Sequence, residues 1–289
     1  MPEGPETADT ARKLNAKLQN LYLIRIKYSD NYKSRDKYNH SIEKDLPLKI
    51  EEIFTKGKRI NFLCENPKNQ GSVFVWFFAM TGRLCFEHRG NPLIEMIFNK
   101  NKKDNKKYSE DDDISLYYED SRKLGFMKYA IYENEIEEIY KDVGPDFLLG
   151  EVDFEYFSKI ISNPRIKNKE IGELLILNSY FSGIGNYLRA EILYASKVSP
   201  FRRLESLTDK EIKKIYDNII KILNESLEKG GMSFRDYLDP FGKEGEFTCK
   251  VYGQKKDPKG NKVVSEKIGT PPKGKDSRRS VHWVPEIQK

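Results

Sequence analysis

Apolar residues near the start of the chain recur every three to four positions. They are Ala8, Ala11, Leu14 and Leu18. Residues at this spacing share one face of an α-helix, and helices tolerate a proline in their first turn. The pattern predicts a short amphipathic helix over residues 6–18, beginning just after Pro5. Pro2 and Glu3 would then lie immediately before a helix N-terminus.

From about residue 21 to residue 132, the pattern changes to short runs rich in β-branched and aromatic residues. The runs are Leu21–Tyr28, Ile50–Phe54, Ile60–Cys64, Val73–Phe78, Leu93–Phe98, Ser115–Tyr118 and Phe126–Ile131. Runs of this length and composition are typical of strands. We predict an all-β unit of the sandwich type for this part of the chain.

The spacing of apolar residues becomes helical again beyond about residue 150. Helices are predicted at about 153–162, 169–178, 187–196 and 208–228. The last is the best marked, because Thr208 and Glu211 form a capping-box pattern and Gly230 follows the end. Its apolar stripe is Ile212, Ile215, Ile219, Leu223 and Leu227. A second, helical domain is therefore predicted, with this stripe in its core.

Beyond the last predicted helix the chain is turn-rich and basic. Two extended segments, Lys262–Ser265 and Ser280–Trp283, flank a Gly/Pro/Lys-rich stretch at 269–279 and predict a β-hairpin. Residues 251–289 contain ten Lys and Arg against four Asp and Glu, whereas residues 1–250 contain 41 of each class. The net charge of +6 therefore lies in the tail. A localised basic segment favours a polyanion, most commonly a nucleic acid.

Several protein classes are disfavoured by composition. No apolar run approaches the roughly 18 residues that a membrane helix needs, and no secretory signal pattern opens the chain. We expect a soluble intracellular protein. Cys64, Cys85 and Cys249 form no C-x-x-C pair, so they cannot build a disulfide framework or a four-cysteine zinc site. Free thiols and no metal are the expected state.

The opening residues, Met1 to Glu6, contain a candidate nucleophile. A small second residue favours removal of Met1, which would leave Pro2 as a secondary amine. An α-amino group has a pKa of about 8, against about 10.4 for lysine. Such an amine can attack the C1′ atom of a sugar and form a Schiff base, while Glu3 moves protons. Taken alone, however, the segment fits a plain helix lead-in better than a catalytic site.

A series of motifs changes that balance. In chain order they are residues 1–6 (MPEGPE), 56–58 (KGK), 80–83 (MTGR), 120–125 (DSRKLG), 144–146 (GPD), 183–193 (GIGNYLRAEIL), 230–237 (GGMSFRDY) and 251–254 (VYGQ). The series resembles the formamidopyrimidine-DNA glycosylase/endonuclease VIII family over essentially the whole chain. The resemblance implies a multi-domain α+β fold. Its parts would be a catalytic β-sandwich with a leading helix at 1–145, a helix-two-turns-helix domain at 146–235 and a finger at 236–289.

The finger departs from the common family pattern. Many members end in a four-cysteine zinc finger, but residues 249–289 contain only Cys249. The closing segment Arg279–Gln288 keeps the finger's order, with Trp283 where a metal ligand would stand. It resembles the zincless finger of animal and giant-virus endonuclease VIII-like enzymes. Packing is expected to replace the metal, through Val263, Val264, Val281, Trp283 and Ile287.

The resemblance also assigns residues of the β region to DNA. Lys58 would contact a phosphate near the lesion, although a solvated lysine is the alternative. Met80, Arg122 and Leu124 match positions whose side chains fill the gap left by a flipped nucleotide, which offsets part of the unstacking cost. Met80 and Leu124 could instead be ordinary core residues. Leu124 also differs from the aromatic residue often found there.

In the helical region, Asn186 is the first expected phosphate anchor. A Gly-x-Gly-Asn turn that opens a helix lets backbone N–H groups approach a phosphate, and the asparagine adds a donor. A helix-capping turn without a ligand is the alternative, since Asn is a common N-cap. Tyr252 and Arg279 are the other expected DNA-binding residues, Arg279 reaching DNA from the hairpin.

The function implied is a bifunctional glycosylase and abasic-site lyase without a cofactor, acting as a monomer on damaged DNA. Double-stranded DNA is the expected substrate, and single-stranded DNA is a further candidate. Pro2 would be the nucleophile, with Glu3, Glu6 and Lys58 assisting. Gly4, in place of a larger apolar residue, is similar to the endonuclease VIII branch, which favours oxidised pyrimidines and hydantoins. The alternatives are a catalytically inactive DNA-damage-binding paralogue and a general RNA- or single-strand-binding protein.

Overall fold

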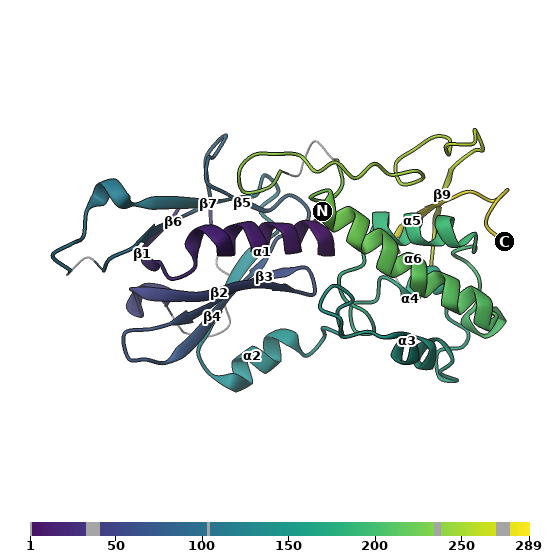
Figure 1. The fold of residues 1–289 in the computed structure, drawn as a ribbon, viewed down its shortest axis with the longest axis horizontal. Helices are drawn as coiled ribbons and strands as arrows, with labels where there is room; N and C mark the ends of the chain where they lie inside the picture. Colours follow the sequence, from purple (N-terminus) through teal and green to yellow (C-terminus); the bar gives the residue numbers. More distant parts are fainter. Residues whose placement is uncertain (1, 33–40, 103–104, 234–237, 270–277) are drawn as a thin grey trace. The chain divides into compact units, whose positions relative to one another are not determined.

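A computed structural model describes residues 2–32, 41–102, 105–233, 238–269 and 278–289, and its ribbon is drawn in Figure 1. The chain forms two compact units. The β unit contains Pro2, residues 6–141 and residues 233–246. The helical unit contains residues 3–5, 142–232 and 247–289. Of the described residues in the C-terminal part of the chain, 238–246 group with the β unit and those from 247 onward group with the helices.

The leading helix α1 comprises Gly4–Leu18 and begins two residues before its predicted start. Its apolar face, which includes Leu14 and Leu18, is buried in the core of the β unit. The Asn15 side chain accepts a 2.7 Å hydrogen bond from the backbone N–H of Ile53, which ties the helix to the sheet. Figure 1 shows α1 running along the sheet, with β6 and β7 above it and β2 and β4 below.

The strands of the β unit form a single antiparallel sheet in the order β5-β7-β6-β1-β2-β3-β4-β8. Their bounds are β1 Tyr22–Tyr28, β2 Leu48–Lys56, β3 Arg59–Glu65, β4 Gly71–Phe77, β5 Arg83–Cys85, β6 Ile94–Asn99, β7 Ile114–Glu119 and β8 Phe126–Ala130. All seven predicted strands are present within a few residues. The three-residue β5 and the acidic helix α2, Glu133–Tyr140, were not predicted. β5 is too short to show a period, and the apolar residues of α2 lie among four glutamates in a segment of only two turns.

The order of the strands shows how the two layers of the predicted sandwich are connected. The β1 and β2 strands pair through only two residue pairs, so the sheet divides there into two halves. Trp76 of β4 and Tyr118 of β7 are far apart in the sheet order, yet their ring centroids lie 4.6 Å apart. The two layers are therefore halves of one sheet that folds onto itself around a shared core.

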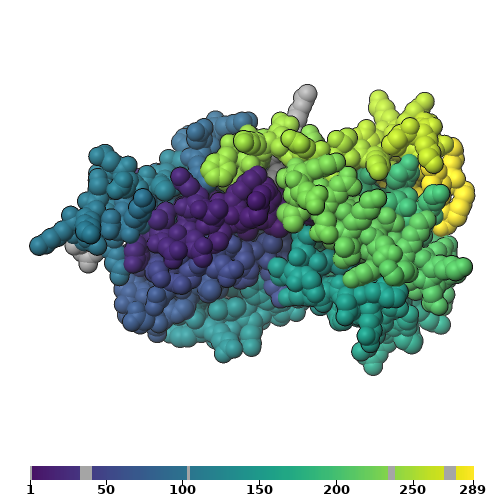
Figure 2. All heavy atoms as spheres, viewed as in Figure 1, coloured from purple at the N-terminus to yellow at the C-terminus, as the bar shows by residue number. Residues whose placement is uncertain are grey.

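The helical unit contains α3 Phe154–Ile161, α4 Ile171–Leu174, α5 Asn186–Ser196 and α6 Asp209–Glu228. The capping box of α6 is confirmed, because Thr208 and Glu211 exchange hydrogen bonds. Its predicted stripe is buried except for half-buried Leu227. The described residues also form 3₁₀ turns at Ile42–Lys44, Glu110–Asp112 and Leu204–Ser206. Figure 2 shows α6 (green) and the C-terminal segment (yellow) at the surface of this unit.

The predicted basic hairpin is present, with strands β9 Val264–Lys267 and β10 Ser280–Trp283. Val251, Val263 and Val284 form a small core beneath it, against which Ile287 packs. Trp283 meets the ring of Phe201 edge-on at 5.3 Å. Among the described residues, no cluster of His, Cys, Asp and Glu could hold a metal ion. None of the described helices is long and apolar enough to cross a membrane.

Candidate functional site

The Glu3 side chain is buried at the N-terminus of α5, with only 2% of its surface exposed. Its Oε2 atom accepts hydrogen bonds from the backbone N–H groups of Gly185 (2.7 Å) and Leu188 (3.3 Å), and its Oε1 atom from that of Tyr187 (3.0 Å). Three donors and the positive end of a helix stabilise the ionised carboxylate. A Cβ atom at Gly185 would lie 2.2 Å from Glu3, so this turn requires glycine.

This arrangement extends one expectation about Glu3 and corrects another. Glu3 lies immediately before the leading helix, as the sequence predicted, but its hydrogen bonds go to α5, more than 180 residues later. The N–H groups of the Gly-x-Gly-Asn turn were expected to face a phosphate. Those of Gly185, Tyr187 and Leu188 instead hold an internal carboxylate.

Gly4, the residue after Glu3, also contacts the turn that precedes α5. The Gly4 N–H donates to the carbonyl of Gly183 over 2.8 Å, and a Cβ atom on Gly4 would lie 2.9 Å from that oxygen. Position 4 therefore has no room for a side chain, which explains why a glycine stands there. Pro2 is also buried and precedes Glu3 directly. Met1 lies outside the described residues.

Lys58 lies in the tight turn between β2 and β3. Gly57 and Lys58 have φ angles of 60° and 64°, so both turn residues are left-handed, as two-residue hairpin loops of this kind require. The hydroxyl of Thr55 contacts that of Thr7 at 3.1 Å, which ties this hairpin to the first turns of α1. Glu6 is buried in the same helical turn, with 3% of its surface exposed. The β unit therefore brings the hairpin of Lys58 close to the turn of Glu6.

The three predicted gap-filling residues lie on two neighbouring loops of the β unit. The Arg122 Nη1 atom lies 3.1 Å from the Met80 sulfur. Met80 is 43% exposed and Leu124 39% exposed, so neither is a core residue. Two apolar side chains and a guanidinium are thus presented together to solvent.

Asp120 organises the loop that carries Arg122 and Leu124. Its carboxylate accepts hydrogen bonds from the backbone N–H groups of Arg122 (3.1 Å), Leu124 (2.8 Å) and Gly125 (2.7 Å), and from the Thr81 hydroxyl. Burial raises the pKa of Asp120, but these hydrogen bonds outweigh it and leave the pKa below its ordinary value. The loop therefore has a fixed backbone beneath exposed side chains.

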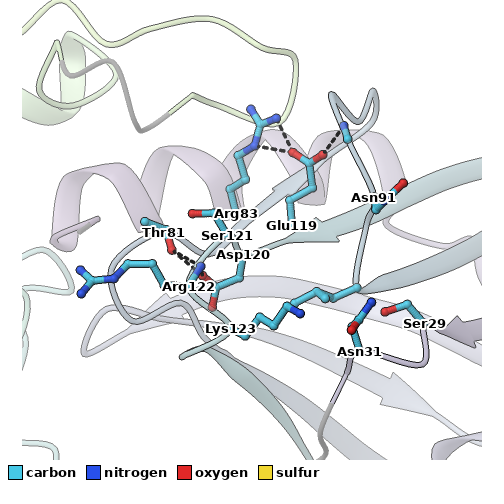
Figure 3. Close-up of a pocket in the computed structure, with 12 residues that line it drawn as sticks. Ser29, Asn31, Thr81, Arg83, Asn91, Glu119, Asp120, Ser121, Arg122 and Lys123 are labelled. Carbon is cyan, nitrogen blue, oxygen red and sulfur yellow. Dashed lines mark hydrogen bonds and ion pairs between the residues drawn. The ribbon is translucent and has the colours of Figure 1, made fainter.

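A pocket of about 620 Å³ adjoins this loop within the β unit. Figure 3 shows Arg83 paired with Glu119 on one side, while Asp120 and Thr81 hold the loop. In the same view Arg122 and Lys123 point in opposite directions, Arg122 away from the pocket and Lys123 toward Asn31. Arg83 and Glu119 pair with each other, and Asp120 binds the backbone of the loop. With these groups already engaged, we assign the pocket no ligand.

The predicted DNA-binding residues of the helical unit lie around the N-terminus of α5. Asn186 is the first residue of the helix, whereas the N-cap position belongs to Gly185. Arg279 is exposed and directly precedes β10. The half-buried Tyr252 meets His282 edge-on at 5.0 Å, and burial together with the nearby charge of Glu3 raises the pKa of Tyr252.

Two charged residues of α5 were given no role by sequence reasoning. Arg189 is fully buried, and Glu191 is 3% exposed. Glu191 accepts hydrogen bonds from the backbone N–H groups of Lys250, Val251 and Tyr252, each at 2.9 Å. Burial raises the pKa of Glu191 against these hydrogen bonds. One sequence feature could have pointed to these two residues, because both lie in a helix whose other positions are mostly apolar. Charged residues are rare in such buried helices unless they have a partner.

Comparison with known proteins identifies three consecutive family domains. The formamidopyrimidine-DNA glycosylase N-terminal domain matches residues 1–127, the H2TH domain of that family residues 143–237, and its C-terminal domain residues 238–289. Curated relatives named formamidopyrimidine-DNA glycosylase include that of Heliobacterium modesticaldum, which is 28% identical over the full length of both chains. Another, from Wolbachia sp. subsp. Brugia malayi, is 26% identical over 89% of this chain and 90% of the relative.

Solved structures show the same fold. The MutM (Fpg) protein of Thermus thermophilus aligns with a TM-score of 0.80 at 24% identity, covering 99% of this chain and 98% of that one. The Lactococcus lactis Fpg, in a complex with DNA containing an abasic site, aligns over the full length of both chains with a TM-score of 0.79 at 22% identity.

Proposed function

Because the chain belongs to the formamidopyrimidine-DNA glycosylase family, we propose that it is a DNA glycosylase and abasic-site lyase of base excision repair that removes oxidised bases. The observation that carries the proposal is the burial of Glu3 on three N–H donors of α5. Chain termini usually fray unless they are tied down. Here the residue after Pro2 is anchored, so an amine at Pro2 would have a defined position.

The proposed reaction starts once Met1 has been removed. The nitrogen of Pro2 attacks C1′ of the damaged nucleotide, and the bond to the base breaks as the base takes up a proton. Ring opening then gives an iminium between Pro2 and the sugar. Loss of the 3′ and then the 5′ phosphate by β,δ-elimination nicks the strand. Water then hydrolyses the iminium and releases Pro2. Glu3 moves protons at the sugar, with Glu6 assisting, so the reaction needs water but no cofactor.

DNA binding is proposed for surfaces on each unit. Lys58, Asn186 and Arg279 would contact phosphates, because each offers a cation or an amide donor. Tyr252 would contact DNA beside them. Met80, Arg122 and Leu124 would occupy the gap left when the damaged nucleotide leaves the duplex, since they are exposed together on a fixed loop.

We further propose that the chain belongs to the endonuclease VIII-like branch with a zincless finger, and that it prefers oxidised pyrimidines and hydantoins. The apolar core under β9 and β10 supports a finger that folds without metal. Incision of a panel of single-lesion duplexes tests the preference. Faster cleavage of 8-oxoguanine than of thymine glycol or hydantoin duplexes would contradict it.

Borohydride trapping tests the nucleophile. The full chain and a version with additional residues before Pro2, which turn its nitrogen into an amide, are incubated with an abasic-site duplex and reduced. We expect a covalent adduct that maps to Pro2 in the processed chain, and at least a 100-fold lower yield in the extended version. An adduct mapped to a lysine would contradict the mechanism. A mobility shift without any adduct would favour the DNA-damage-binding paralogue.

A further inference from the structure

Arg189 is a buried cation that the reaction proposed above does not use. None of its surface is exposed, and burial lowers its pKa to about 10, with nearby Arg279 adding to the effect and Glu3 opposing it. The guanidinium therefore remains charged at neutral pH. Its Nε atom has no hydrogen-bond partner within the described residues. A buried charge is costly unless polar groups around it compensate, and within the described residues those groups are carbonyl and amide oxygens.

The hydrogen bonds of Arg189 connect three separate segments of the helical unit. Its Nη1 atom donates to the carbonyl of Gly172 in α4 at 3.1 Å. Its Nη2 atom donates to the carbonyl of Ser280 at 2.7 Å and to the side-chain oxygen of Asn186 at 3.3 Å. Ser280 begins β10 and directly follows Arg279. One nitrogen atom thus holds both the asparagine that opens α5 and the strand that begins after Arg279.

The bond to Asn186 also orients its amide. An asparagine amide has one acceptor oxygen and a nitrogen with two donors. Since the oxygen already accepts from Arg189, the nitrogen remains as the group that can donate to a phosphate. A planar guanidinium with fixed donors suits such a bridge, whereas the single ammonium of lysine cannot reach several acceptors in one plane.

We propose that Arg189 is a positioning residue that holds Asn186 and Arg279 as one phosphate-binding pair. The inference rests on the proposed DNA-binding function and deepens it. In a finger without zinc, this guanidinium connects the phosphate-binding end of the hairpin to α5 and α4. Arg189 itself does not touch DNA in this account, and its charge matters less than its geometry.

A double-mutant cycle tests the coupling. Binding of a duplex with a tetrahydrofuran abasic-site analogue is measured by fluorescence anisotropy for wild type, Arg189→Lys, Asn186→Ala and the double variant. Arg189→Lys keeps the charge, and we expect at least tenfold weaker binding. In the Asn186→Ala background the same substitution should weaken binding by less than about threefold, because the two residues act together. Arg202→Lys, an arginine of the same unit bonded to Ser206 and Glu211, is the matched control and should bind as wild type.

The proposal would be overturned if the double variant lost affinity by the product of the two single losses. It would also be overturned if Arg189→Lys bound DNA as tightly as wild type. Borohydride trapping of wild type on abasic DNA separates the two claims. If wild type forms no adduct, the enzymatic function fails, whereas an active wild type with an unaffected Arg189→Lys rejects only the inference.

A second experiment leaves Arg189 in place, in case its substitution prevents folding. Each phosphate near the abasic analogue is replaced in turn by a neutral methylphosphonate, and the effect of Asn186→Ala and of Arg279→Ala is measured on each duplex. We expect both substitutions to lose their effect at the same phosphate or at neighbouring phosphates of one strand. Sensitivity at phosphates on opposite strands would contradict a single pair.

Discussion

In both units a carboxylate accepts hydrogen bonds from several backbone N–H groups. The two units differ in how far apart along the sequence the carboxylate and its donors lie. In the β unit, Asp120 accepts from residues two, four and five positions later. In the helical unit, Glu3 accepts from residues 182 to 185 positions later, and Glu191 from residues 59 to 61 positions later. Asp120 shapes one exposed loop, whereas the two glutamates join segments that only the folded chain brings together.

We infer that the two kinds of carboxylate have different structural roles. A local carboxylate gives a loop one conformation and leaves its side chains available for contact, as for Met80 and Leu124. A buried long-range carboxylate fixes one segment against another, and its loss leaves several N–H groups without partners. Removing a partner from a buried donor costs about 1–3 kcal/mol for each donor. We therefore expect the long-range carboxylates to be more sensitive to substitution.

Glu3→Gln should have the largest effect. The amide cannot move protons at the sugar, and its NH₂ group would face backbone N–H donors. We expect the single-turnover rate of base excision to fall by about 100-fold or more, with affinity for an abasic-site analogue changing much less. Rapid-quench kinetics and anisotropy measure the two quantities. Glu155→Gln, an exposed position in α3, is the control, and a Glu3→Gln rate within tenfold of wild type would contradict the role of Glu3.

Glu191→Gln should chiefly reduce stability. Its carboxylate accepts three N–H groups from residues 250–252, and a glutamine offers one oxygen together with an NH₂ group that opposes a donor. We expect the free energy of unfolding of the helical unit to fall by about 2 kcal/mol. Urea denaturation followed by circular dichroism measures it, again with Glu155→Gln as control. A loss below about 0.5 kcal/mol would mean that the long-range carboxylate is no more important than a local one.

Asp120→Asn should have the smallest effect, about 1 kcal/mol, because two of its three backbone donors, Arg122 and Leu124, belong to exposed residues of the loop. The pH dependence has a definite sign. The folded pKa of Asp120 lies below its ordinary value, so its stabilisation is present above about pH 4 and is lost as the pH falls through the folded pKa. Thermal melts between pH 2 and 6 should show a shallower acid limb in Asp120→Asn than in wild type. Exposed Asp112→Asn should match wild type, and identical limbs in all three would refute the assignment.

Periodicity predicted most of the regular structure. The stripe and capping box of α6 depend on residues three to four positions apart, and each strand depends on its own short run, so local physics suffices for them. Periodicity failed to predict β5 and α2, which are both short. The β5 strand is held by pairing with β7, and α2 is held by packing against the sheet. The candidate site residues came from a series of motifs, which named Asn186 and Arg279 but gave no role to Arg189 or Glu191.

The amino-acid sequence by itself determined most of the helices and strands, the basic tail, the lack of a four-cysteine finger and the family that the chain resembles. Tertiary structure decided which helix end receives Glu3, that the two β layers are one sheet, and that one guanidinium bridges Asn186 and Ser280. The physical reason is range. Helical periods, caps and turns depend on neighbours along the chain, whereas buried hydrogen bonds depend on which distant donors and acceptors are brought within about 3 Å, and that is set by packing of the whole unit.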